Sequence, residues 1–389
     1  MFALVNGTIF TMSKMGIIKE GIVLVNEGKI VGVGRKIKIP DEAEKIDVQG
    51  KIVFPGMIDA HNHIGGHAEA EDPPFDNNEW TSPVTPHVRM IDGVNPLDEG
   101  FQTAAKAGVT TIFCTPGSAN VISGTAAVLK TVGKTISDMI LLDPAAMKMA
   151  FGRKFPRPSS DIPYPATRMG TAAILRNTLI KTINYLKKKR KAEENPEKEP
   201  PEPNIGFEYL ALVLQRKIPA HVHVSRADDI MTFARIADEF GFNWCIAHGF
   251  EAHVVAEELA KRKVPVVLGP IIYPNFHPDI DWSPEIAVIL HKAGVKIALQ
   301  SDGPAVFPTQ HLPLLAAAVV RAGMDEWEAL KAITINAAEI IGVDHRVGSI
   351  EVGKDADLVI FSDHPLKWRS KVEKVFINGK EIENLENRK

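Results

Sequence analysis

Several features that mark other classes of protein are scarce in this chain. Among 389 residues there are two cysteines, Cys114 and Cys245, each within a short apolar run and outside any paired or metal-spaced cluster. This excludes a disulfide-stapled scaffold, and we expect both thiols to be small buried core groups. Lys and Arg total 45 against 48 Asp and Glu, a net charge of −3. Without a basic excess, neither nucleic acid nor an anionic membrane surface is an expected partner.

Long uninterrupted apolar runs are also missing. No stretch reaches the roughly 18 residues of a membrane span, and residues 1–7 show no basic leader followed by an apolar core, so we expect a cytoplasmic protein with no membrane partner. A basic tract at 187–191 passes at once into Glu- and Pro-rich sequence up to residue 203, and we interpret it as a solvated, partly mobile insertion. With 45% hydrophobic residues, the chain can hold one large domain and an accessory one.

The two ends of the chain resemble each other. Residues 1–53 alternate short β-branched runs with Gly and Asn, a pattern typical of small antiparallel strands. Residues 345–389 resume this pattern after a different middle part. We therefore predict a small β-sandwich domain formed by both termini, with a second domain at 54–344.

The middle part repeats a strand run followed by a helical pattern, which predicts an α/β fold with a parallel sheet and crossover helices. Eight candidate strands can be counted, at 52–59, 109–114, 125–131, 139–149, 218–224, 244–247, 264–268 and 296–300. Eight parallel strands in a segment of this length indicate a (β/α)8 TIM barrel, in which catalytic residues collect at the C-terminal ends of the strands.

A possible metal motif follows the first of these strands. Asp59, His61 and His63 have the spacing i, i+2 and i+4, so on a strand their side chains share one face and two imidazoles can close on one divalent cation. By itself, a His-x-His sequence is better explained by two ordinary core or surface histidines than by a metal site.

Other metal-binding residue types occur at the ends of later strands. His221 and His223 end the fifth strand, His248 ends the sixth, and Asp302 follows the eighth. A barrel brings these positions together at its catalytic end. Imidazole and carboxylate groups suit Zn2+ or another first-row ion that keeps an open position for water. The sequence therefore predicts a metal site built from several strands.

These residues resemble the amidohydrolase superfamily. The stretch 54–63, Phe-Pro-Gly-Met-Ile-Asp-Ala-His-Asn-His, is similar to the family's first-strand motif, and the later strand-end residues complete the pattern. The segments 334–342 and 348–359 are similar to the stretch by which these enzymes leave the barrel and re-enter the sandwich. The resemblance covers nearly the whole chain and is closest to the imidazolonepropionase-like and prolidase-like branch.

The resemblance implies roles for individual residues. It implies that Asp302 is a carboxylate that binds the metal and also shuttles protons. It further implies that the imidazoles of His61, His63 and His248 are metal ligands. On the fifth strand we favour His221 as the ligand and assign His223 to the substrate side, although the reverse assignment stays open.

Lys148 resembles the carboxylated lysine that bridges two metal ions in some members. It lies in Ala145–Gly152, at the end of the fourth strand, and an ordinary solvated lysine is the alternative. Lys154 is the fallback for this role, so the sequence leaves one or two ions open. Arg226 and the loop segments 76–80 and 115–124 are candidates for shaping the pocket, with ordinary turn chemistry as the alternative explanation. His67 is a candidate loop residue near the substrate, and we expect no metal role for it.

The resemblance implies hydrolysis of a C–N bond in a small molecule: an amide, a cyclic amide or an N-acyl or dipeptide-like compound. A metal-activated water would attack, while Asp302 would take its proton and return it to the leaving nitrogen. Two alternatives are deamination of an aminated heterocycle on the same scaffold and a non-catalytic scaffold protein. The specific substrate, and the choice between a monomer and a homo-oligomer, are not determined by the sequence.

Overall fold

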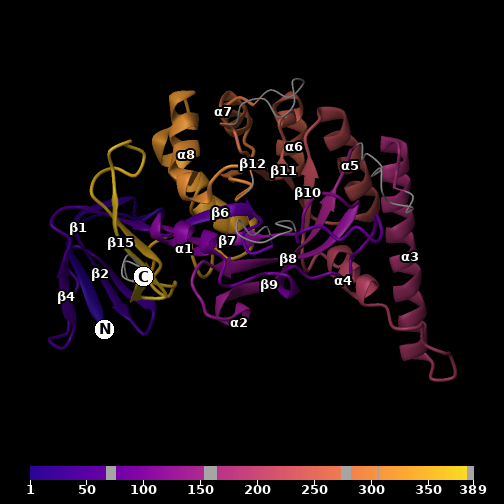
Figure 1. Cartoon of the computed structure of the whole chain (residues 1–389), viewed down its shortest axis with the longest axis horizontal. Coiled ribbons are helices and arrows are strands. Elements are labelled where there is room, and N and C mark those ends of the chain that lie inside the picture. The colour runs from indigo at the N-terminus through magenta and orange to yellow at the C-terminus, as the bar shows by residue number, and fades with distance from the viewer. Residues whose placement is uncertain (67–75, 153–163, 273–281, 305, 383–389) are drawn as a thin grey trace.

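The computed structural model describes residues 1–66, 76–152, 164–272, 282–304 and 306–382, which form two β-sheets with flanking helices (Figure 1). The strands are β1 (Phe2–Phe10), β2 (Ile17–Asn26), β3 (Lys29–Gly34), β4 (Glu44–Asp47), β5 (Ile52–Pro55), β6 (Met57–Asn62), β7 (Val109–Cys114), β8 (Ile122–Lys130), β9 (Ile140–Ala150), β10 (Ala220–Val224), β11 (Trp244–His248), β12 (Val266–Leu268), β13 (Ile297–Leu299), β14 (Leu358–Phe361), β15 (Val372–Ile377) and β16 (Lys380–Glu381). The helices are α1 (Glu99–Lys106), α2 (Ile136–Met139), α3 (Arg168–Glu194), α4 (Ile205–Leu214), α5 (Ala227–Phe240), α6 (Ala256–Arg262), α7 (Glu285–Lys292), α8 (Leu312–Arg321), α9 (Glu326–Ala332) and α10 (Ile335–Ile340).

One sheet joins the two ends of the chain. Its strand order is β16-β15-β14-β5-β1-β2-β3, with β4 paired to β1, and β14 runs antiparallel to β5. Side chains from both ends, among them Ile9, Val23, Leu358 and Phe376, share one apolar core. Strands of both termini thus make a separate β domain at one end of the molecule (Figure 1). Its eight strands form a single hydrogen-bonded sheet, and the boundaries at 53 and 344 stay a prediction.

The second sheet is a nearly closed barrel of eight strands in the order β13-β12-β11-β10-β9-β8-β7-β6. Six predicted strands correspond to β7 and β9 to β13. The prediction that all eight are parallel is wrong, because β8 runs antiparallel to β7 and to β9. The physical reason is connection length: seven residues join β7 to β8 and nine join β8 to β9. A parallel crossover needs about a dozen or more.

The predicted first barrel strand, 52–59, is in fact two strands in different sheets. Its first part is β5 in the terminal sheet and its second part is β6 in the barrel. The chain changes sheets at Gly56, whose N–H donates to the Asp357 carbonyl at 2.8 Å. A Cβ at Gly56 would lie 2.0 Å from Thr110 Oγ1, so only glycine fits without a shift. The Pro55-Gly56 pair inside the apolar run 52–58 was the available signal for this change.

The barrel helices follow from ordinary apolar periodicity. In α5 the buried residues include Ile230, Phe233, Ala234 and Ala237, which share one helix face, and the helix ends at Gly241 with φ of 71°. Helices α5 to α8 lie beside one another along one side of the barrel (Figure 1).

The basic tract 187–191 is helical and mostly exposed, so the solvated part of its interpretation is confirmed, whereas its mobility stays a prediction. It lies in α3, where Lys189 pairs with Glu208 of α4 at 2.6 Å. Helix α3 lies at the end of the molecule opposite to the β domain (Figure 1). Among the residues described, no helix is both long and apolar enough to cross a bilayer.

Candidate metal and catalytic site

The predicted site residues gather at the C-terminal ends of the parallel barrel strands. They come from β6 and the residue after it, from β9, β10 and β11, and from the segment after β13. The structure brings together all seven of them: His61, His63, Lys148, His221, His223, His248 and Asp302. Most are buried, and His61 and Lys148 have no exposed surface.

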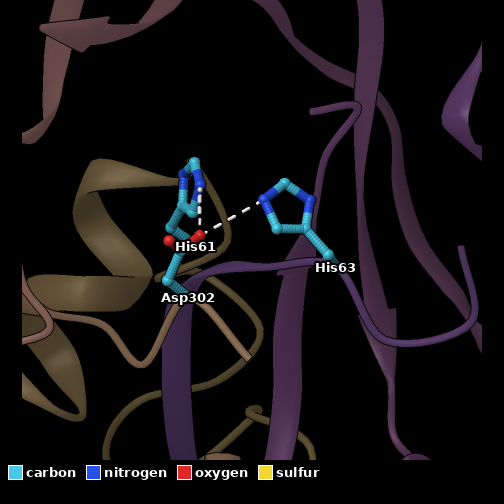
Figure 2. A group of neighbouring side chains, drawn as sticks. All are labelled: His61, His63 and Asp302. Atoms are coloured by element: carbon cyan, nitrogen blue, oxygen red, sulfur yellow. Dashed lines mark ion pairs between the residues drawn. The ribbon is translucent and has the colours of Figure 1, made fainter. Parts of the chain in front are cut away.

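His61, His63 and Asp302 form a compact group around the Asp302 carboxylate (Figure 2). Asp302 Oδ1 lies 3.3 Å from Nε2 of His61 and 3.3 Å from Nε2 of His63. One ligand atom from each residue lies within 4.8 Å of the others, so the three could hold one metal ion. The group fits the donor set that zinc and similar ions prefer.

Backbone carbonyls determine which nitrogen of two of the histidines carries the proton. His63 Nδ1 lies 2.7 Å from the Thr115 carbonyl, and His248 Nδ1 lies 2.9 Å from the Gly269 carbonyl. Since a carbonyl only accepts, each Nδ1 donates, and the Nε2 of the neutral ring keeps its lone pair. The lone pair of His63 therefore faces a carboxylate oxygen, and two acceptors this close need a cation or a proton between them.

The buried environment favours the protonation states that bind metal. Burial lowers the pKa values of His61, His221 and His248, and the positive charge of Lys148 lowers them further. Burial alone would raise the pKa of Asp302, but the imidazoles of His248, His61 and His63 beside it hold that pKa well below its usual range. Neutral imidazoles and an ionised carboxylate are the forms that ligate metals.

Lys148 is not a solvated lysine. Its side chain is fully buried, its Nζ lies 3.4 Å from His61 Nε2, and its backbone pairs in register with His221 of the next strand. This position is compatible with the predicted bridging role, but carboxylation stays a prediction. The fallback Lys154 and the loop residue His67 lie outside the described residues.

The two histidines of β10 occupy different surroundings. His221 is buried with its ring stacked on Phe113 at 4.4 Å; its Nε2 lies 2.8 Å from His61 Nδ1, and its Nδ1 lies 3.2 Å from Cys245 Sγ. His223 is half-buried, and its ring packs against His248 at 4.4 Å. Both lie at the site, so the choice of ligand stays a prediction.

Sequence reasoning assigned no role to a buried polar cluster beside the histidines. It consists of Asp59, Asn62, Ser301 and Thr309, joined by side-chain hydrogen bonds. Burial raises the pKa of Asp59 to about 6 despite the hydrogen bonds from Ser301 and Asn62. The i, i+2 spacing of Asp59 from His61 was a usable signal in the sequence for its place in this cluster. No comparable signal marks Thr309.

Cys245 was also missed. It is buried as expected, but its thiol contacts His221. Its place on β11, three residues before His248, was the available signal.

Two of the predicted loop segments lie together at this end of the barrel. Asn120 donates to the carbonyls of Glu79 and Ser82 at 2.6 and 2.8 Å, and Asn78 accepts from the Ala119 N–H at 3.0 Å. Arg226, by contrast, is exposed at the start of α5.

Family models match almost the whole chain. The amidohydrolase family model matches residues 52–382, and the NagA composite domain matches residues 1–53. The chain is similar to imidazolonepropionase of Geobacillus kaustophilus, with 26% identity over 90% of this chain and 86% of that protein. It is 29% identical to amidohydrolase tasK of Hapsidospora irregularis, over 92% of this chain but only 39% of that larger protein.

Solved structures agree with this family. An amidohydrolase from Thermotoga maritima superposes with a TM-score of 0.92 at 42% identity, covering 98% of this chain and 99% of that one. A prolidase complexed with N-methylphosphonate-L-proline shares the fold, with a TM-score of 0.64 at 17% identity over 98% and 99% of the chains. The chain therefore belongs to the amidohydrolase family, on its imidazolonepropionase-like branch, and is a hydrolase that acts on C–N bonds.

Proposed function

We propose that the chain binds one or two divalent metal ions, Zn2+ or another first-row metal, and hydrolyses a C–N bond in a small molecule. The observation that carries the proposal is the convergence of the His63 Nε2 lone pair, His61 Nε2 and the Asp302 carboxylate within 4.8 Å of one another. An imidazole lone pair and a carboxylate oxygen are both acceptors, and a cation between them stabilises them at these distances.

The remaining buried groups would complete the ligand set. Lys148, His221 and His248 lie on adjoining strands and contact His61. Carboxylation of Lys148 would turn a buried cation into an anionic bidentate ligand suited to a second ion. His221 is proposed as the β10 ligand, and His223 is proposed to contact substrate from its half-buried position.

The chemistry divides between metal and protein. When bound, the metal supplies Lewis acidity and lowers the pKa of a water molecule toward neutrality. Asp302, held as a carboxylate by the imidazoles, accepts the proton of the attacking water and returns it to the leaving nitrogen.

The substrate is proposed to be an amide, a cyclic amide or an N-acyl or dipeptide-like compound. The imidazolonepropionases among the relatives favour a cyclic amide within this group. The three-residue metal group supports an enzyme over a non-catalytic scaffold.

Metal analysis coupled to a substrate screen tests the proposal. The purified chain should contain one or two metal ions, and one class among N-acyl amino acids, dipeptides and hydantoin-like rings should be hydrolysed. Activity should disappear with a chelator and return with Zn2+. The control Asp363→Asn changes an exposed carboxylate paired with Lys367 and should leave both readouts unchanged.

Two results would contradict the proposal. Absence of metal after purification under metal-replete conditions would return the chain to the non-catalytic alternative. Release of ammonia from aminated heterocycles, with no cleavage of the amide panel, would establish deamination instead.

A further inference from the structure

The barrel is closed at one seam mainly by side chains. Strands β6 and β13 are the two outermost strands of the sheet. In the parts of the chain that the structure describes, a single bridge links Asn62, the last residue of β6, to Gly303 in the segment after β13. The catalytic ends of the two strands are also the places from which His61, His63 and Asp302 extend. How this seam is held therefore affects the geometry of the metal group.

Asp59 connects the two sides of the seam. Its Oδ1 accepts the Ser301 N–H at 3.1 Å, and its Oδ2 accepts the Ser301 hydroxyl. The same carboxylate also accepts from the Asn62 side chain at 2.8 Å and from the His61 N–H at 3.3 Å. Asp59 and Ser301 have no exposed surface. A buried carboxylate with this many donors is tightly oriented.

Asp302 lies between two fixed neighbours. It adopts the left-handed region with φ of 56°, which is unfavourable for a residue with a Cβ. On one side Ser301 is bound to Asp59; on the other, Gly303 donates to Ser301 Oγ at 3.0 Å and accepts the His63 N–H at 2.7 Å. These bonds hold the backbone in the conformation that aims the carboxylate at His61 and His63.

We infer that Asp59 and Ser301 act as positioning residues: together they form a clasp across the barrel seam that sets the direction of the Asp302 carboxylate at the metal group. This inference rests on the metal site of the proposed function. Thr309 extends the clasp, since its hydroxyl contacts Ser301 Oγ at 3.1 Å and accepts from Asn62 at 2.8 Å.

The test is a metal affinity, which does not depend on knowing the substrate. Parent and variant proteins are stripped of metal, and their affinity for Zn2+ is measured by competition with a chromophoric chelator. Ser301→Ala should weaken Zn2+ binding about 10- to 100-fold, the range seen when groups that orient metal ligands are removed. Asp59→Asn, which keeps the shape of the side chain, should weaken it in the same direction.

A matched control separates positioning from general destabilisation. Thr131→Val removes another buried hydroxyl, which donates to the Val109 carbonyl at 2.9 Å at the opposite end of the barrel. It should also lower the melting temperature but leave Zn2+ affinity within about twofold, since it touches no group of the site.

The outcomes are distinct. Parent-like Zn2+ affinity in folded Ser301→Ala and Asp59→Asn, or an equal loss in Thr131→Val, would overturn the clasp. If Ser301→Ala does not fold, Asp59→Asn alone decides the question. A parent protein that binds no Zn2+ would refute the proposed metal function itself.

Discussion

Replacing Lys130 with Met should destabilise the junction between the barrel and the β domain. Lys130 ends β8 at the barrel floor, 3% exposed, and pairs with two buried carboxylates, Asp355 at 3.1 Å and Asp357. Both carboxylates lie in the segment that leads into β14. Asp355 would keep partners in Lys29 and Arg346, whereas Asp357 would lose its ion pair.

The magnitude follows from that unpaired charge. Removing one partner of a buried ion pair costs about 3–5 kcal/mol. At about 2.1 cal/mol/K per residue, the entropy of unfolding of 389 residues is about 0.8 kcal/mol/K, so the melting temperature should fall by about 4–6 °C.

Differential scanning calorimetry at one fixed scan rate measures the shift. The double variant Lys130→Met with Asp357→Asn should lose less than the sum of the single variants, because the orphaned charge is gone. As a control, Lys367→Met removes an exposed partner of Asp363 and should change the melting temperature by less than about 1 °C. A Lys130→Met shift as small as this control, or strict additivity, would refute the reasoning.

Three further predictions follow. Asp302→Asn should lower turnover more severely than metal content, because the amide cannot accept and return the proton. Steady-state kinetics together with metal analysis checks this. Retained turnover would show that Asp302 is not the proton-transfer group. Gly56→Ala should cost about 1–3 kcal/mol by overpacking against Thr110, while Gly93→Ala, with no atom closer than 3.8 Å, should be tolerated in the same thermal melts. Burial alone would raise the pKa of Asp355, but ion pairs with Arg346 and Lys130 lower this pKa from 3.8 to about 2. The ionised carboxylate therefore contributes at most about 2 kcal/mol to the free energy of unfolding. This contribution is present above pH 4 and is lost as the pH falls toward 2. Denaturant midpoints of the parent and Asp355→Asn should therefore converge at low pH, and a constant gap would contradict this assignment.

Local patterns determined much of the fold and of the site. Strand β7 has the predicted bounds, because a short β-branched run between polar segments is a local signal. The i, i+2 spacing of His61 and His63, and the positions of His248 and Asp302 at strand ends, also depend on nearby residues alone. Hydrophobic periodicity and strand-end positions therefore predicted the barrel and the residues that gather at its end, while the family followed from the resemblance of 54–63, 334–342 and 348–359 to known motifs.

Only the tertiary structure decided features that depend on contacts between distant residues. The direction of β8 depends on how its short connections pack, although their length was an available signal. The burial of Lys148 and the contact of Cys245 with His221 arise when neighbouring strands align in register. Asp59 and Ser301 are separated by 242 positions and meet only because the barrel closes. Closure of the barrel brings such groups into contact, and no local pattern in the sequence predicts these contacts.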